Sequence, residues 1–156
     1  MKEVSMNKQM KLSPHFTLGE LTKTKHVTAD GNIPSRVVIE NLIRVCGWLE
    51  ELRARFNRLY SRKEEPIVIN SGYRSPEVNR LAGGAANSNH LTGCAVDIRC
   101  AGKEQMIRYA AILLDIADGT GKDYDELLLE QRGSVCWLHF AVRPKDNRHK
   151  ISFLKA

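Results

Sequence analysis

The sequence has no long apolar run and no segment with the pattern of a secretory signal. No stretch approaches the ~20 consecutive apolar residues that a membrane-spanning helix needs, so we expect no membrane span. The N-terminus starts with basic residues, but the apolar stretch of roughly 7–15 residues that a secretory signal requires does not follow them. We therefore expect the chain to be cytoplasmic as synthesised.

Cysteine is present, but its spacing is not that of a metal site. The chain has four cysteines, at Cys46, Cys94, Cys100 and Cys136, and no two of them form a C-x-x-C pair. This spacing makes a cysteine zinc site a poor interpretation. In the absence of a secretory signal, we expect the side chains to be reduced thiols.

Aromatic residues are scarce, and the net charge is positive. Aromatics make up 6% of the chain and do not alternate with its basic residues, as they do in stacking platforms for single-stranded nucleic acid. We therefore expect no nucleic acid partner. The net charge of +6 is typical of a solvated surface or of one attracted to a polyanion. The alternative interpretation of this charge is a basic nucleic-acid-associated protein, which would bind DNA with a steep dependence on salt concentration.

The length of 156 residues fits one domain. Residues 1–13 are polar and are predicted to be a flexible N-terminal segment. Residues 14–156 are predicted to form a single domain, which we expect to be a monomer.

The elements predicted by periodicity and capping signals indicate an α+β fold, because helices come first and antiparallel strands follow. Helices are predicted after Thr17, after Ser35, after Ser75 and over residues 104–116, the last closed by Asp118-Gly119. Strands are predicted over residues 67–70, 94–100, 127–130 and 135–142, with a Gly133-Ser134 turn joining the last two.

Two of these strands each place a possible metal ligand on the face opposite the core. Side chains alternate between the two faces of a strand. In residues 94–100 the apolar side chains fit the core face and Asp97 fits the other, while His90 lies in the loop before this strand. In residues 136–142, His139 falls on the non-core face by the same alternation.

An aspartate inside an apolar strand needs a cation or several donors, because an unpaired buried carboxylate is costly. If the two strands are neighbours, His90, Asp97 and His139 converge. Two imidazoles and one carboxylate suit Zn²⁺ and leave a fourth position for water, whose pKa such a site lowers to about 7. The same side chains could hold another divalent ion.

Residues 88–97 match the signature S-x-H-x-x-G-x-A-x-D in full, and through it the chain resembles the D-alanyl-D-alanine carboxypeptidase family of zinc peptidases. That family also holds vancomycin-resistance dipeptidases and phage endolysins that cut the L-alanyl-D-glutamate bond. Residues 137–139 resemble the segment with its second metal histidine, and residues 71–75 resemble its S-G-Y-R-S segment. The resemblance implies a hedgehog-type metallopeptidase fold, a small antiparallel sheet flanked by helices, with Zn²⁺ as the cofactor.

The S-G-Y-R-S segment supplies Arg74, and the family's arginine at this place lies in the active site. A fixed guanidinium would stabilise the negative charge that peptide hydrolysis builds on the carbonyl oxygen, or bind a substrate carboxylate. The alternative is a structural ion pair, for example with Glu77. Ser88 is predicted to bind substrate or to hold His90. Tyr73 is predicted to bind substrate, to support the site or to pack.

The catalytic base is less well defined by the resemblance. Many relatives carry a glutamate three residues before the last histidine, where this chain has Cys136. Shorter relatives place it on the preceding strand, where the candidates are Glu126 and Glu130. The predicted turn pairs residue 130 with residue 137, so Glu130 would lie diagonal to His139, roughly 7–8 Å away. Glu126 has the same parity, and we prefer Glu130 because it ends the apolar run next to the turn.

The resemblance thus implies hydrolysis of peptide bonds in peptidoglycan stem peptides, with Glu130 as the base and Arg74 stabilising the negative charge on the carbonyl oxygen. The enzyme would be a D-Ala-D-Ala carboxypeptidase or an L-Ala-D-Glu endolysin. It would act on the cell wall after release or non-classical export, and the absent secretory signal favours the endolysin. Cys136 motivates the alternative, a catalytically inactive peptidoglycan-binding module that keeps the fold and the metal.

Overall fold

The structure is a computed structural model that describes residues 6–155. Its helices and strands follow one another in an order that confirms the α+β fold class. The elements are β1 (Lys11–Ser13), β2 (Phe16–Thr17), α1 (Leu18–Leu21), α2 (Arg36–Tyr60), β3 (Ile69–Ser71), α3 (Pro76–Leu81), the 3-10 helix η1 (Asn89–Thr92), β4 (Ala95–Cys100), α4 (Lys103–Thr120), β5 (Glu126–Arg132), β6 (Val135–Ala141) and β7 (Lys150–Lys155).

The central sheet has the strand order β3-β4-β6-β5-β7. The strands β3, β4, β6 and β5 pair with one another in antiparallel fashion, as predicted. The strand β7 lies at the edge of the sheet and pairs with β5 in parallel. The strand β7 and the small β1–β2 hairpin were not predicted from the sequence. The Gly133-Ser134 turn joins β5 to β6 with Arg132 opposite Val135, and Gly133 has the positive φ of 59° that such a turn requires.

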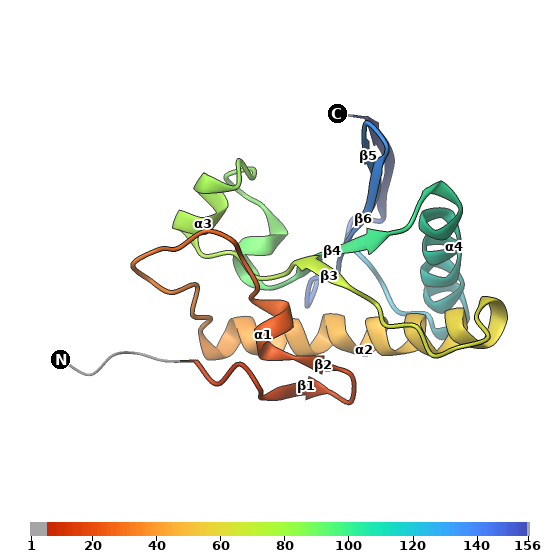
Figure 1. The fold of residues 1–156 in the computed structure, drawn as a ribbon, viewed down its shortest axis with the longest axis horizontal. Helices are drawn as coiled ribbons and strands as arrows, with labels where there is room; N and C mark the ends of the chain where they lie inside the picture. Colours follow the sequence, from red (N-terminus) through yellow and green to blue (C-terminus); the bar gives the residue numbers. More distant parts are fainter. Residues whose placement is uncertain (1–5, 156) are drawn as a thin grey trace.

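The core lies between one face of this sheet and the two long helices. Figure 1 shows α2 running along one side of the molecule, with β3 and β4 crossing above it and α4 standing beside the sheet. Trp48 of α2 packs on Phe140 of β6 with ring centroids 5.3 Å apart, and Phe56 of α2 meets Tyr109 of α4 at 4.9 Å. The opposite face of the sheet is therefore the one that can carry polar side chains.

The predicted helix starts are confirmed by their caps. Thr17 forms a full capping box with Glu20, and the side chains of Ser35 and Ser75 each accept a hydrogen bond from the third residue beyond them. The last long helix differs from its prediction, because α4 continues through Gly119 to Thr120 and is capped by Gly121, whose φ is +71°. A left-handed glycine of this kind is a common helix terminator.

Regular structure is present before the domain boundary predicted at residue 14. Residues 1–5 of the predicted flexible segment lie outside the described residues. Within the rest of it, Lys11–Ser13 forms β1, and Leu12 is buried in the core at 7% exposure. The packing of β1 against α2 and its pairing with β2 account for this burial, which the polar composition of residues 1–13 does not indicate.

The four cysteines are all buried and unpaired, as expected for reduced thiols. Cys100 and Cys136 lie directly opposite each other on β4 and β6 and belong to the core. Among residues 6–155, no helix combines the length and the apolar character needed to cross a bilayer.

Candidate metal centre

The register between β4 and β6 brings the two predicted strand ligands together. Asp97 of β4 lies directly opposite His139 of β6. Val96 and Ile98, the neighbours of Asp97, are fully buried in the core, so the carboxylate faces the other side of the sheet. The alternation predicted from the sequence is therefore correct for both strands.

The helix η1 brings the third side chain over this face. Ser88 caps η1 by accepting a hydrogen bond from the backbone N–H of His90 at 3.1 Å. Gly93 then reverses the chain into β4 with φ +74°. The Nδ1 atom of His90 donates to the carbonyl oxygen of Gly72 at 2.7 Å, and this bond turns Nε2 toward Asp97.

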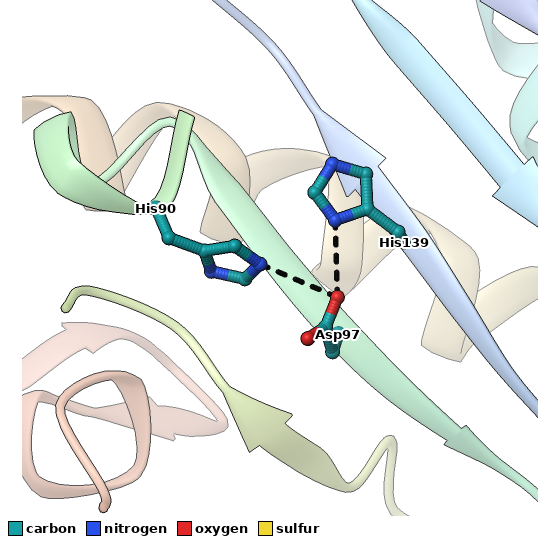
Figure 2. A group of neighbouring side chains, drawn as sticks. All are labelled: His90, Asp97 and His139. Atoms are coloured by element: carbon teal, nitrogen blue, oxygen red, sulfur yellow. Dashed lines mark hydrogen bonds and ion pairs between the residues drawn. The ribbon is translucent and has the colours of Figure 1, made fainter. Parts of the chain in front are cut away.

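The three side chains point toward one another from η1, β4 and β6 (Figure 2). One ligand atom from each, on His90, Asp97 and His139, lies within 4.8 Å of the other two. Asp97 Oδ1 is 3.3 Å from His90 Nε2 and 3.0 Å from His139 Nδ1. Ligands about 2.1 Å from a tetrahedral zinc ion lie about 3.4 Å from one another, and the two distances from Asp97 Oδ1 are close to this value.

The two histidines also dominate the electrostatics of Asp97. Burial alone would raise its pKa, but the hydrogen bonds and charges of His139 and His90 outweigh burial and hold the pKa well below the ordinary value. Burial would likewise lower the pKa of His139, whereas its hydrogen bonds to Asp97 and Glu126 raise the pKa to about 9. The centre thus has a carboxylate that stays ionised and attracts a cation.

Arg74 contacts the centre through the second oxygen of the same carboxylate. Its Nη2 donates to Asp97 Oδ2 at 3.2 Å, and its Nε donates to Ser71 at 3.0 Å. Asp97, and not Glu77, is thus its ion-pair partner. Because Arg74 binds Oδ2, the other oxygen of Asp97, Oδ1, is left to face both histidines. Arg74 also lines the open cleft beside them.

Glu126 binds the outer nitrogen of His139, a role that was not predicted from the sequence. His139 Nε2 donates to Glu126 Oε1 at 3.0 Å, and Asn89 Nδ2 donates to the same oxygen at 2.6 Å. The bond from His139 holds the pKa of Glu126 at about 2, against the effect of burial. Glu126 therefore orients the imidazole so that Nδ1 faces Asp97.

Glu130 occupies the other diagonal position from His139 and has fewer partners. It lies opposite Trp137, as the predicted turn required, and accepts a hydrogen bond from Trp137 Nε1 at 2.8 Å. Burial raises the pKa of the Glu130 carboxyl, and the negative charge of Asp97 adds to this effect. Glu130 is thus a cleft-lining carboxylate that is not bound to either histidine.

The two residues predicted to bind substrate have different positions. Ser88 lines the cleft and holds the backbone of His90, as described above. Tyr73 is buried at 8% exposure and packs in the hydrophobic core, so the expectation that it contacts substrate is corrected. Tyr73 lies two residues after the end of β3, and its carbonyl oxygen accepts a hydrogen bond from the side chain of Asn32 at 3.1 Å.

Asp125 is a buried carboxylate that sequence reasoning missed. It has no exposed surface and accepts hydrogen bonds from Arg148 Nε at 3.0 Å, Arg148 Nη2 at 2.8 Å and Asn89 Nδ2 at 2.7 Å. Arg143 lies 3.2 Å from it. Its position directly before Glu126 is the available signal, because a charged pair at the start of an apolar strand needs partners.

The candidate metal centre lies in a cleft of about 450 Å³, a size typical of a site for a small molecule or for part of a peptide. Its walls come from the loop after α3, from η1 and from strands β4, β6, β5 and β7. The lining residues used below are Arg74, Glu126, Glu130, Trp137, Arg148 and Lys150.

Comparison with known proteins found a matching family model and a similar relative. A family model described as Peptidase M15 matches residues 14–122, which include Arg74, His90 and Asp97 and end before His139. The chain is also 29% identical over 84 residues to the zinc D-Ala-D-Ala carboxypeptidase of Streptomyces albus G. That stretch is 54% of this chain and 31% of the relative, so the match spans less than a third of the relative's length.

Proposed function

Because the chain belongs to the peptidase M15 family, we propose that it is a zinc-dependent metallopeptidase that hydrolyses peptide bonds in peptidoglycan stem peptides. The observation that carries the proposal is the convergence of His90, Asp97 and His139 at the floor of an open cleft. The similarity to a zinc D-Ala-D-Ala carboxypeptidase supports both the metal and the class of substrate.

In this proposal, His90 Nε2, Asp97 Oδ1 and His139 Nδ1 hold the zinc ion. Zinc with a free coordination position acts as a Lewis acid and lowers the pKa of water at that position. The chain prepares these atoms in advance, because Gly72 fixes the tautomer of His90 and Glu126 fixes that of His139.

Glu130 is the proposed general base. It lies diagonal to His139 on the cleft face, and burial raises its pKa toward the range in which a carboxylate can accept and return a proton. It takes a proton from the attacking water and gives it to the leaving amine. Glu126 is the weaker candidate, because its Oε1 already accepts hydrogen bonds from His139 and Asn89 and its Oε2 lies 3.7 Å from Arg148.

Arg74 is proposed to stabilise the negative charge that develops on the substrate carbonyl oxygen. Its guanidinium lines the cleft and is fixed by Asp97 and Ser71, so it needs little reorganisation when substrate binds. Loss of one such donor typically raises a barrier by about 2.7–4 kcal/mol.

The test is zinc content together with cleavage of purified peptidoglycan, with the products identified by mass. We expect about one zinc ion per wild-type chain, loss of both zinc and cleavage in His139→Ala, and loss of cleavage on chelation that added zinc restores. His15→Ala, on the exposed side chain paired with Glu50, is the control and keeps both properties. A metal-free wild type that cleaves at full rate contradicts the proposal.

Product masses also separate the two forms of the proposal. A released C-terminal D-alanine identifies a carboxypeptidase, and a new N-terminal D-glutamate identifies an L-Ala-D-Glu endopeptidase. The enzyme would act on the wall after release or non-classical export.

A peptidoglycan-binding module without catalysis is the second candidate. It is favoured by Cys136, which stands where many relatives carry the base and is buried at 4% exposure in the core. A wild type that binds zinc and peptidoglycan but releases no product would support the module.

A further inference from the structure

The edge strand β7 contributes one row of side chains to the cleft face of the sheet. In the parallel pairing of β5 with β7, Lys150 lies opposite Glu126 and Leu154 lies opposite Glu130. Directly opposed residues in a sheet point to the same face, so Lys150 shares a face with Glu126 and with the metal ligands beyond it. Lys155 falls on the other face, opposite Gln131.

Three long cationic side chains line the cleft, and two of them are already paired. Arg74 is bound to Asp97 at 3.2 Å, and Arg148 is bound to Asp125 at 2.8 Å. Lys150 is exposed and has no ion-pair partner within residues 6–155. Its ammonium group is therefore the unneutralised positive charge of the cleft wall.

The carboxylate nearest to Lys150 in the sheet does not compete for it. Glu126 Oε1 accepts from His139 and Asn89, and its Oε2 lies 3.7 Å from Arg148. Because these groups compensate the charge of Glu126, an anion brought into the cleft is attracted to the ammonium group of Lys150 at the Glu126 end of β7, away from Glu130, which lies opposite Leu154.

We infer that Lys150 is a specificity-determining residue that binds a free carboxylate of the substrate at the β7 end of the cleft. The inference rests on the proposed function, since it assigns that substrate a carboxylate within reach of the scissile bond. Stem peptides with lysine as their third residue offer two carboxylates of this chemistry: the α-carboxylate of a D-glutamate linked through its side chain, and the C-terminal carboxylate.

The test compares three synthetic stem peptides on zinc-loaded protein. One carries both carboxylates, one has the D-glutamate α-carboxylate converted to an amide, and one has the C-terminal carboxylate converted to an amide. A hydrogen bond to a charged group contributes about 1.5 kcal/mol or more, which corresponds to about tenfold. We expect one of the two amidations, and not the other, to raise the wild-type KM about tenfold with little change in kcat.

The variant is Lys150→Met, which keeps the length of the side chain and removes its charge. In Lys150→Met the ratio of KM between the acid peptide and the sensitive amide should fall close to one, as a double-mutant cycle requires. Lys155→Met is the matched control, because it removes a lysine from the same strand on the face away from the cleft. It should keep the wild-type ratio.

Binding of the same peptides by calorimetry separates this inference from the proposed function. If no peptide is cleaved, the proposed function fails, but a tenfold loss of affinity for the acid peptide alone in Lys150→Met still supports the carboxylate subsite. Equal losses for acid and amide peptides in Lys150→Met, or no effect of either amidation on the wild type, would overturn the inference.

Discussion

The two glutamates on β5 allow a test of which one supports zinc binding and which one supports catalysis. Glu126 and Glu130 both lie diagonal to His139, but Glu126 bonds to its Nε2 and Glu130 to the indole of Trp137. We predict that Glu126→Gln weakens zinc binding and that Glu130→Gln slows turnover. Glutamine preserves size and one acceptor oxygen at both positions, so each change removes mainly the charge.

The expected magnitudes follow from the two roles. Loss of an outer partner of a metal ligand typically lowers metal affinity 10–100-fold, so Glu126→Gln should lose about 1.4–2.7 kcal/mol of zinc binding. Loss of a general base typically lowers kcat by 10²–10⁴, so Glu130→Gln should raise the barrier by about 2.7–5.4 kcal/mol. The two variants should therefore fail in different measurements.

The assay measures the zinc dissociation constant by competition with a chromophoric chelator and kcat at saturating zinc. Glu126→Gln should recover most of its kcat when zinc is saturating, whereas Glu130→Gln should bind zinc normally and stay slow. Unchanged tryptophan fluorescence in Glu130→Gln, measured with Trp48 replaced by phenylalanine in both proteins, would show that the surroundings of the Trp137 indole are preserved. The reversed pattern would refute this reasoning and assign the base to Glu126.

Two further predictions concern stability. Gly93→Ala should lose about 2–4 kcal/mol of unfolding free energy in urea, because φ is +74° and the added Cβ would lie 2.8 Å from the carbonyl oxygen of Val38. Gly121→Ala, with a similar φ but open space around it, should lose only about 1–2 kcal/mol; equal losses would contradict the steric argument. Asp125→Asn should lose about 1.5–3 kcal/mol at neutral pH, because the carboxylate binds Arg148. Burial alone would raise the pKa of Asp125, but the bonds from Arg148 and Asn89 lower it from 3.8 to about 2. Its stabilisation is therefore present above pH 3.8 and disappears as the pH falls toward 2, where variant and wild type should unfold alike.

The face on which each ligand lies could be predicted from the sequence, because one side of the sheet is buried. The apolar alternation around Asp97 and His139 leaves only the open face for them. Their direct opposition could not be predicted, since it depends on the register that α4 and the β5–β6 turn impose on distant strands.

The choice between Glu126 and Glu130 shows where strand periodicity reaches its limit. Both residues have the same parity and the same diagonal relation to His139, so alternation treats them alike. They differ in their neighbours: Glu126 accepts a hydrogen bond from Asn89 of η1, and Glu130 accepts one from Trp137 of β6. The strand β7 was missed for a similar reason, because its pairing with β5 is long-range and its side chains are mostly exposed.

The motif over residues 88–97 fixes some positions by steric need and leaves open one that this chain uses heavily. Gly93 lacks space for a Cβ against Val38, which accounts for its fixed glycine. Among the positions that the motif leaves open is Asn89, which is buried and donates hydrogen bonds to both Asp125 and Glu126. Because Glu126 orients His139, the second imidazole depends on an amide that lies next to His90 in the chain. The two histidines are therefore coupled through Asn89 as well as through the carboxylate between them.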